Sequence, residues 1–418
     1  RDGNDVGEGG QALAKISSVR SSDKQELLAQ CCFQIACDVT NPLCGPQGAT
    51  YIYGPQKGVT EEMAPVLDAG MKNYAEVTAS LTGKDHSPAE GAGAAGGLGF
   101  AFLSYLNGQL TPGIQLILNA VHLEDEMKDA DALIVRIAKC DEHAIENSSN
   151  LKVIGRTGVG YDSVDVKTAT AHGIPVVITP GANNRSVAEH AVAMMFALSK
   201  NMLEAQIEMG KGNWKIRDAK KAFELEGKTV GILGLGAIGR EVARICEGCG
   251  MKVSAYDPFM NKEQIEGYGA VYYEDYEELL KDSDVVTIHV PLTEQTKDMI
   301  KKEQLELMKK TAILINCSRG GIINEADWVE ALKNGVIAGG GTDVYCNEPP
   351  AADDPLLNCP NLVASPHSAA QTREAVIKMA QMCINGCLAI IEGKKWPYVA
   401  DKAVYDHPKW KNAEWAEV

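Results

Sequence analysis

Residues 229–240 read TVGILGLGAIGR. The apolar run TVGIL leads directly into Gly234, Gly236 and Gly239, which form the pattern G-x-G-x-x-G, and helix-forming residues follow. The first glycine permits a tight turn, the second lets a pyrophosphate approach the backbone, and the third allows the helix to pack closely on the strand. This stretch therefore predicts a strand, a turn and a helix that bind a dinucleotide, with its phosphates at the helix N-terminus.

The next apolar run, KVSAY at residues 252–256, ends at Asp257, about 20 residues beyond the glycines. A carboxylate at this place accepts hydrogen bonds from a ribose hydroxyl and repels a 2′-phosphate, so the sequence favours NAD over NADP. A second match to G-x-G-x-x-G lies at residues 91–96. It follows the polar residues GKDHSPAE, which cannot form a buried strand, and we expect no dinucleotide there.

Outward from this motif, short apolar runs alternate with helical patterns from Ala132 onward. Such alternation predicts the α/β class, with parallel strands covered by helices on both faces. A long helix is predicted to start at Ser186, because Ser186 and Glu189 have the spacing of a capping box, and we place a domain boundary there. The predicted strands are ALIVR, LKVIG, IPVVI, TVGIL, KVSAY, VVTIH, AILIN and LVASP.

The bulk composition disfavours several classes of protein. Of the 418 residues, 45% are hydrophobic and 23% charged, which is typical of a globular chain with two or three domains. The formal net charge of −16 disfavours binding to nucleic acid or to an anionic membrane. No apolar run approaches the ~18 residues that span a bilayer, and the polar N-terminus is unlike a signal peptide.

The 12 cysteines are scattered through predicted strands and helices. Cys246 and Cys249 form a lone CxxC on the helix that follows the glycine motif, with no second pair nearby. We interpret them as buried helical thiols, and we expect reduced cysteines in the cytoplasm and no metal site.

C-terminal to the glycine motif, three segments offer polar groups at strand ends. Arg319 lies in INCSRGG, Asp343 and Glu348 lie in GTDVYCNEPP, and His367 lies in ASPHSAAQ. In a doubly wound sheet the carboxyl ends of the strands line the ligand crevice. Hydride transfer to a 2-keto acid needs a cation that holds the carboxylate, a general acid, and a partner for that acid. Arginine, histidine and a carboxylate have this chemistry.

Each of these residues alone has an ordinary structural interpretation. Arg319 is then a surface cation, Glu348 a solvated acid in a turn, and His367 a histidine packed in a loop. Their occurrence at successive strand ends, behind a dinucleotide motif, favours a catalytic site instead.

From about residue 129 to 395 the sequence resembles the D-isomer-specific 2-hydroxyacid dehydrogenases. The resemblance implies an NAD-dependent oxidoreductase that interconverts a D-2-hydroxy acid and its 2-keto acid, on a substrate such as hydroxypyruvate and glycerate or 3-phosphoglycerate. It implies that His367 is the acid and base, Glu348 its partner, and Arg319 the substrate-binding cation. The stretches that carry it are LKVIGRTGVGYDSVDV, TPGANNRSVAEHAVAMMFAL, GKTVGILGLGAIGR, VVTIHVPLTEQT, LINCSRGGIINE, GTDVYCNEPP and SPHSAAQT.

The same resemblance implies further contacts. Asp343 would contact the nicotinamide carboxamide, Arg136 would lie at the substrate, and His289 would be structural or line the cofactor. The small-molecule substrate is the expected partner, in a homodimer. The substrate carboxylate would meet the backbone of Gly158, Val159 and Gly160, and NAD would be lined, besides the three glycines and Asp257, by Ala237, Ile238, Pro291, Thr296, Cys317 and Ser318.

Residues 1 to about 134 resemble an internal piece of a glycerate kinase. The matching stretches are IACDVTNPLCGPQGATYIYGPQKGVTEEM and AEGAGAAGGLGFAFLSYLNGQLTPGIQLIL. We therefore expect a chimera: a kinase-like α/β fragment without kinase activity at 1–128, a substrate domain at 129–183 and 366–395, a Rossmann domain at 184–365, and a tail at 396–418.

The chimera leaves the dehydrogenase part incomplete. A complete substrate domain in the family starts with two further βα units, which this chain does not show, so a partial flavodoxin-like domain is expected. Two alternatives to an active dehydrogenase remain: an NAD-binding interaction protein without catalysis, and a chimera that is inactive.

Overall fold

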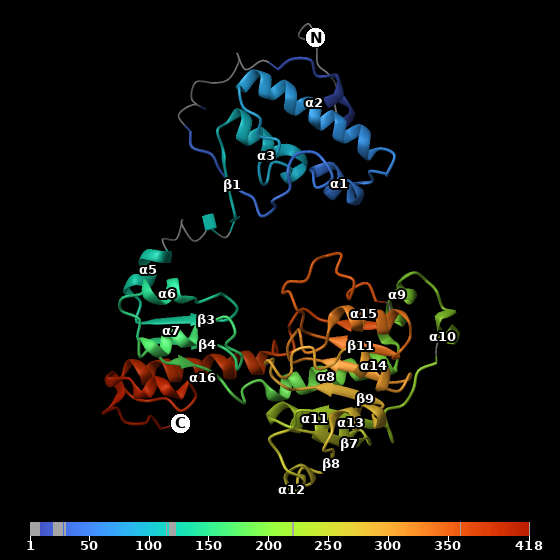
Figure 1. Cartoon of the computed structure of the whole chain (residues 1–418), viewed down its shortest axis with the longest axis vertical. Helices are drawn as coiled ribbons and strands as arrows, with labels where there is room; N and C mark the ends of the chain where they lie inside the picture. Colours follow the sequence, from blue (N-terminus) through green and yellow to red (C-terminus); the bar gives the residue numbers. More distant parts are fainter. Residues whose placement is uncertain are drawn as a thin grey trace. The chain divides into compact units, whose positions relative to one another are not determined.

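The computed structural model describes residues 9–19, 28, 31–113, 115–116, 123–219, 221–359 and 361–417. The chain divides into two compact units, residues 1–130 and 131–418 (Figure 1). The second unit contains two parallel sheets, so the predicted α/β class with a doubly wound sheet is confirmed.

The first unit has a core of its own. Its small parallel sheet pairs β1 (Gln34–Ala36) with β2 (Gln109–Thr111). Helices α2 (Ala64–Thr82) and α3 (Ala94–Tyr105) contribute to a core formed by Leu43, Ala75, Ala92 and Phe100. The other described elements are η1 (Gly10–Lys15), α1 (Ala49–Tyr53), η3 (Pro55–Lys57) and α5 (Leu123–Asp129).

The glycine tract at residues 91–96 does not form a dinucleotide turn after a strand. Ala95, Gly96 and Gly97 have positive φ angles of 50°, 74° and 104°, which kink the start of α3. The backbone of Gly91 is packed so closely that a Cβ there would lie 2.7 Å from the Cys37 sulfur. The tract therefore lets backbone segments pack closely in this unit.

The larger part of the second unit, residues 184–365, is called the Rossmann lobe here. Its parallel sheet has the order β12-β11-β10-β9-β6-β7-β8, and the direction of winding reverses between β6 and β9. The carboxyl ends of these two strands therefore form the crevice in which such folds bind ligands. The strands are β6 (Thr229–Leu233), β7 (Lys252–Tyr256), β8 (Val271–Tyr272), β9 (Val285–Ile288), β10 (Ile313–Asn316), β11 (Gly339–Thr342) and β12 (Leu362–Ala364).

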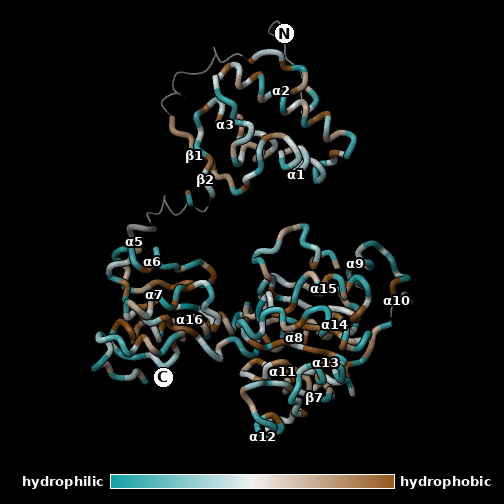
Figure 2. Tube along the Cα trace, in the orientation of Figure 1, coloured by the Kyte–Doolittle hydropathy of each residue, from teal (hydrophilic) through white to brown (hydrophobic). Residues whose placement is uncertain are grey.

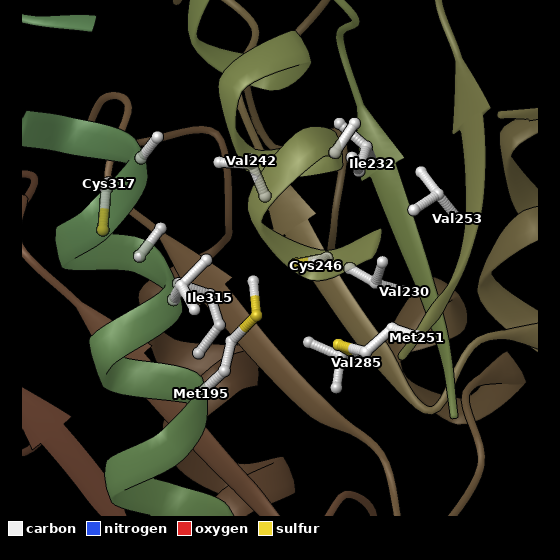
Figure 3. Close-up of a cluster of buried hydrophobic side chains, with 14 of the residues drawn as sticks. Met195, Val230, Ile232, Val242, Cys246, Met251, Val253, Val285, Ile315 and Cys317 are labelled. Atoms are coloured by element: carbon white, nitrogen blue, oxygen red, sulfur yellow. The ribbon is translucent and has the colours of Figure 1, made fainter. Parts of the chain in front are cut away.

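Helices cover both faces of this sheet. On one face α8 (Asn184–Ser199) and α11 (Ala237–Gly248) close a core in which Met195 and Val242 meet Ile232 and Ile315 (Figure 3). The other face is covered by α13 (Tyr276–Asp282), α14 (Lys302–Leu307) and α15 (Glu325–Lys333). The central strands are apolar along their length, as expected for strands buried on two faces (Figure 2). The lobe also contains α9 (Met202–Gly210), α10 (Ile216–Ala219) and α12 (Lys262–Glu266).

Residues 131–183 and 366–417 form what is called the small lobe here. Its parallel sheet has the order β3-β4-β5, with β3 (Ala132–Val135), β4 (Val153–Arg156) and β5 (Val176–Val177). The long helix α16 (Arg373–Ile391) packs on β4 and β5. The other core lies beneath α6 (Glu142–Glu146) and α7 (Val166–Ala171).

The residues beyond 395 belong to this small lobe. Two short 3-10 helices, η4 (Lys402–Asp406) and η5 (Pro408–Trp410), follow α16. Trp396 and Trp410 are buried, and the Trp410 indole donates to the Gly173 carbonyl at 2.8 Å. The Ile178 amide donates to the Tyr398 carbonyl, and the Ala400 amide donates to the Val176 carbonyl. The C-terminal segment therefore lies along the β5 edge of the sheet.

One expectation from the sequence was wrong. The predicted capping box at Ser186 does not form, because α8 begins at Asn184 and the Ser186 hydroxyl bonds instead to Thr372, the N-cap of α16, at 2.7 Å. In addition, α16 is long and apolar enough, with a mean hydropathy of 1.4, to cross a membrane. Charged and polar residues interrupt this helix, so it contains no continuous apolar run of that length. In the structure Cys383 and Cys387 of α16 are core residues of the small lobe.

Candidate active site

The glycine turn after β6 has the geometry that the sequence predicts. Gly234 has a φ of +93°, and a Cβ there would lie 2.8 Å from the His289 carbonyl oxygen. A Cβ on Gly239 would lie 2.2 Å from the Gly234 carbonyl oxygen, so α11 can approach β6 only with glycine there. Nothing lies within 4 Å of a Cβ on Gly236. The first and third glycines are thus needed by the fold, whereas the space at the second is open for a ligand.

Asp257 holds this turn from the end of β7. Its carboxylate accepts from the Leu235 amide at 2.9 Å and from the Phe259 amide at 3.0 Å. Gly236 is the N-cap residue of α11, whose first two residues are Ala237 and Ile238. No side chain accepts a hydrogen bond from the first amides of that helix. The N-terminal amides of a 12-residue helix therefore face the open space at Gly236, an arrangement that suits a pyrophosphate.

A hydrogen bond joins the loops that follow β9 and β10, and a second one lies within the loop after β9. The Ser318 hydroxyl donates to the Val290 carbonyl, and the Thr296 hydroxyl donates to the Pro291 carbonyl at 2.6 Å. Cys317 is buried, and burial raises the pKa of its thiol. These residues follow the strands that flank the switch point, and their contact with NAD stays a prediction.

The structure brings His367 and Glu348 together. Nδ1 of His367 lies 2.6 Å from Oε2 of Glu348, and the other carboxylate oxygen accepts from the Tyr345 amide at 3.1 Å. A carboxylate that accepts from Nδ1 leaves Nε2 of the ring as the atom that can exchange a proton with a ligand. His367 has a positive φ of 49° and a half-exposed side chain, so the imidazole lies at the surface of the lobe rather than in its core.

Arg319, at the end of β10, contacts the small lobe. Its Nε donates to the Asp162 carboxylate at 3.1 Å, and its Nη1 donates to the Ser318 carbonyl at 2.8 Å. A Cβ on Gly160 would lie 1.7 Å from Nη2 of Arg319, so the guanidinium packs directly on the backbone of that loop. Within the described residues no hydrogen bond or ion pair joins Arg319 to His367.

The loop at residues 158–160 offers backbone donors. The Gly158 amide bonds to the Arg156 carbonyl at 2.9 Å. In the described part of the chain the amides of Val159 and Gly160 have no acceptor. Arg136 is exposed just beyond β3, the strand that neighbours β4.

Asp343 is a buried carboxylate. Its side chain is 1% exposed, and its two oxygens accept from the Ser365 hydroxyl at 2.5 Å and from the amides of Ser368 and Ala369 at 2.8 Å each. Asp343 therefore anchors the loop that carries His367. Its contact with the nicotinamide carboxamide stays a prediction.

His190 is a residue of this site that the sequence reasoning missed. It projects from α8, and its Nε2 lies 2.8 Å from the Ser365 hydroxyl, which in turn donates to Asp343. The available signal was a polar residue in the apolar run that follows Ser186. The sequence alone gave no indication of its partner.

His289 and Cys246 are unsuited to the chemistry. Burial lowers the pKa of His289 to about 4, so this ring is neutral near pH 7, and its Nε2 bonds to the Thr287 hydroxyl at 2.9 Å. Burial raises the pKa of Cys246 to about 12. Across the described ranges, no group of three or more histidine, cysteine or acidic side chains is arranged to hold a metal ion.

Several known proteins are similar to the second unit of the chain. The model of the NAD binding domain of the D-isomer specific 2-hydroxyacid dehydrogenases matches residues 192–369. A glyoxylate reductase of Korarchaeum cryptofilum is 39% identical over 284 residues, which are 67% of this chain and 85% of that protein. The second unit of the chain belongs to the D-isomer specific 2-hydroxyacid dehydrogenase family. It carries the NAD-binding domain of that family.

Two further dehydrogenases extend the comparison. A D-3-phosphoglycerate dehydrogenase of Archaeoglobus fulgidus is 44% identical over 269 residues, 64% of this chain, but the match spans only about half (51%) of that protein. The crystal structure of D-lactate dehydrogenase with NAD+ from Lactobacillus jensenii superposes with a TM-score of 0.59 at 31% identity, covering 67% of this chain and 89% of that one.

The first unit has a different origin. The model of the glycerate kinase family matches residues 1–224, and the N-terminal part of the chain belongs to that family. This match overlaps the dehydrogenase match at residues 192–224. The predicted chimera is therefore confirmed, although the kinase match runs beyond the expected limit near residue 134.

Proposed function

We propose that this protein is an NAD-dependent oxidoreductase that interconverts a D-2-hydroxy acid and its 2-keto acid. Hydroxypyruvate and glycerate, or their phosphorylated counterparts, are the proposed substrates. The observation that carries the proposal is the 2.6 Å contact between Nδ1 of His367 and Glu348, in a unit that also has an open dinucleotide turn. A histidine oriented in this way is a general acid and base for a hydroxyl group.

Different residues bind the keto acid, stabilise its developing charge and transfer the proton. The guanidinium of Arg319 and the amides of Val159 and Gly160 bind the substrate carboxylate. Arg319 also stabilises the negative charge that develops on the keto oxygen. His367 donates its Nε2 proton to that oxygen, and Glu348 holds the ring in the tautomer and orientation that this transfer needs. Bound NADH supplies the hydride.

The dinucleotide is held by the turn and by the loops around it. The amides at the start of α11 bind the pyrophosphate, and Asp257 accepts from the ribose. We propose that the nicotinamide end is lined by the loops that follow β9 and β10 and by Asp343.

Steady-state oxidation of NADH with hydroxypyruvate, glyoxylate and 3-phosphohydroxypyruvate tests this function. His367→Ala should lower kcat by about 1,000-fold, because general acid catalysis contributes at that scale, while NADH affinity stays the same. His172→Ala, which removes an exposed histidine of the small lobe, is the matched control and should behave as the wild type. Normal turnover in His367→Ala would exclude the proposed role.

We also propose that the protein is a homodimer. Exposed apolar side chains lie at the end of α8, on α9 and in the segment between α9 and α10, helices that project from the Rossmann lobe (Figure 1). A second copy that covers this surface would remove it from water. Sedimentation should therefore give a dimer for the wild type and a monomer for Ile207→Glu. The exposed side chains are Phe196, Met202, Leu203, Ile207, Met209 and Trp214.

Two further proposals concern organisation. We propose a cytoplasmic location, which is supported by thiols such as those of Cys140 and Cys317, since free thiols persist in a reducing compartment. We also propose the domain limits given by the sequence, with a seam near residue 128, which is supported by the division into compact units after Ala130.

A further inference from the structure

Two cysteines of α16 lie on one face of that helix, against β4. Cys383 and Cys387 are four residues apart, so their side chains are neighbours on successive turns. A Cβ on Gly155 of β4 would lie 2.6 Å from the Cys383 sulfur and 2.7 Å from the Cys387 sulfur. Both sulfur atoms therefore fill the space that one glycine leaves free. They form a pair, which is called the α16 dithiol here.

The two thiols of the α16 dithiol are not equivalent. The Cys387 thiol donates a hydrogen bond to the Cys383 sulfur, and this bond lowers the pKa of Cys383 in spite of its burial, with a further contribution from the positive charge of Arg156. The same hydrogen bond, together with burial, raises the pKa of Cys387. Because the thiolate is the reactive form of cysteine, Cys383 is the nucleophile of the pair and Cys387 is the thiol beside it.

The α16 dithiol is buried, but its cover belongs to the open edge of the sheet. Cys383 and Cys387 are 0% and 4% exposed. A Cβ on Gly155 would also lie 3.4 Å from Cγ1 of Ile134, a half-exposed side chain of β3. Within the described residues β3 has a strand partner on one side only. An edge strand opens locally at a lower free energy than a central strand, so a small oxidant can reach these sulfurs.

We propose that the α16 dithiol is a redox modification site, at which hydrogen peroxide converts Cys383 and Cys387 to a disulfide. The Cys383 thiolate attacks one oxygen of the peroxide, the O–O bond breaks, and the leaving hydroxide takes a proton to become water. The resulting sulfenic acid is attacked by the Cys387 sulfur, the S–S bond forms, and a second water leaves. Two thiols thus lose two electrons and two protons, and one peroxide molecule becomes two waters.

The disulfide deforms α16 where this helix packs on β4. Side chains four residues apart in a helix have Cβ atoms about 5–6 Å apart, whereas a disulfide holds its Cβ atoms at about 3.5–4.5 Å. The turn between Cys383 and Cys387 must therefore tighten, and its contact with Gly155 changes. A strained disulfide is also readily reduced, which makes the modification reversible.

The deformation reaches the substrate loop through β4. Gly155 and Arg156 end this strand, and the loop at residues 158–160 follows directly. Oxidation should therefore raise the KM for the keto acid and leave the Kd for NADH unchanged, because the dinucleotide turn belongs to the other sheet. This consequence, unlike the oxidation itself, rests on the proposed dehydrogenase function.

Peptide mapping without reduction tests the modification. Wild-type protein is treated with hydrogen peroxide, its remaining thiols are alkylated, and its peptides are analysed by mass spectrometry. We expect the peptide with Cys383 and Cys387 to escape alkylation and to contain two hydrogen atoms fewer, and dithiothreitol to restore both thiols. Cys246 and Cys249 of α11 are the internal control. They should stay reduced, because burial raises the pKa of Cys246 to about 12.

Steady-state kinetics test the consequence. In the oxidised wild type, KM for hydroxypyruvate should rise by about tenfold, a scale typical of coupling between two sites of one protein. Cys383→Ala removes the pair, so peroxide should leave its KM unchanged. Cys140→Ala removes another buried thiol of the small lobe and is the matched control, which should respond as the wild type does. Ile134→Ala uncovers the dithiol and should shorten the half-time of its oxidation.

The outcomes separate this inference from the proposed function. A dithiol that stays reduced in peroxide overturns the inference, and so does a disulfide that leaves KM unchanged. If the reduced wild type turns over no keto acid, the proposed function fails. Amide exchange of residues 153–160 then decides the inference, which needs faster exchange in the oxidised protein and is overturned by equal exchange. If Cys383→Ala does not fold, a rise in KM that dithiothreitol fails to reverse in the wild type overturns the inference.

Discussion

The two parallel sheets of the second unit differ in how completely their strands are covered. In the Rossmann lobe, β6 and β9 lie inside the seven-stranded sheet and are buried between helices on both faces. In the small lobe, β3 is an edge strand, and its outer edge has no strand partner within the described residues. Ile134 of β3 is 52% exposed, and Ile137, just beyond it, is 83% exposed.

The residues for cofactor binding and proton transfer and the residues for substrate binding differ in the same way. The dinucleotide turn, Asp257, Arg319 and Glu348 belong to the covered sheet or to its loops. His367, at the start of residues 366–417, is held against that sheet by Glu348 and by the bonds of Asp343 to Ser368 and Ala369. The loop at residues 158–160 and Arg136 belong to the sheet with the open edge. Cofactor binding and proton transfer should therefore be robust to changes in the small lobe, whereas substrate affinity should depend on its stability.

Hydrogen exchange of backbone amides should show the largest contrast. We expect the amides of β3 to exchange about 1,000-fold faster than those of β6 and β9, because an open edge strand is released by local opening at a lower free energy than a central strand. Exchange followed by mass spectrometry on peptides from both lobes measures the ratio. Equal protection of the β3 and β6 amides from exchange would contradict the proposed difference in stability between the two sheets.

NADH binding can be weakened without unfolding the Rossmann lobe. Gly236→Val adds a side chain where the structure has open space, so we expect an unchanged melting temperature and a loss of NADH affinity of at least about tenfold, or ~1.4 kcal/mol. Gly248→Val is the matched control, because a Cβ at this position of α11 also meets nothing within 4 Å. Fluorescence titration with NADH should separate the two variants. Equal affinities would mean that the pyrophosphate does not approach Gly236.

A smaller effect is expected at the link between α8 and the catalytic loop. His190→Ala removes the 2.8 Å contact with Ser365, whose hydroxyl is bonded to Asp343. We expect kcat to fall by about tenfold with little change in the Kd for NADH, the scale typical of a supporting hydrogen bond behind a functional group. His190→Gln, which keeps a hydrogen-bonding side chain, should recover part of the activity. If His190→Ala lowers NADH affinity instead, the residue acts on the cofactor and not on the loop.

The sequence predicted most of the fold because most strands have local signals. All eight predicted apolar runs contain strands, from β3 to β12. The strand β11 was missed because its sequence is Gly339-Gly-Gly-Thr342. A Cβ on Gly340 would lie 2.7 Å from the Trp328 ring, and one on Gly341 would lie 2.8 Å from Ile315. This strand is thus specified by bulky neighbours on other elements rather than by its own residues.

The same reasoning applies to the site. Strand ends and the spacing of the glycines pointed to the turn and to the loops of Arg319, Glu348 and His367. The link from His190 to Ser365 joins residues 175 positions apart, and Asp343 turned out to anchor a loop. Such contacts depend on how helices and loops pack, and no local pattern predicts them.

The central claim is that the second unit of the chain performs hydride and proton transfer. A single-turnover experiment tests this claim most directly. Protein loaded with one equivalent of NADH is mixed with hydroxypyruvate or 3-phosphohydroxypyruvate, and NADH absorbance and product are followed together. We predict that the wild type consumes its NADH and forms the 2-hydroxy acid, while His367→Ala keeps NADH bound and unreacted. A wild type that binds NADH and transfers no hydride to either acid would contradict the account.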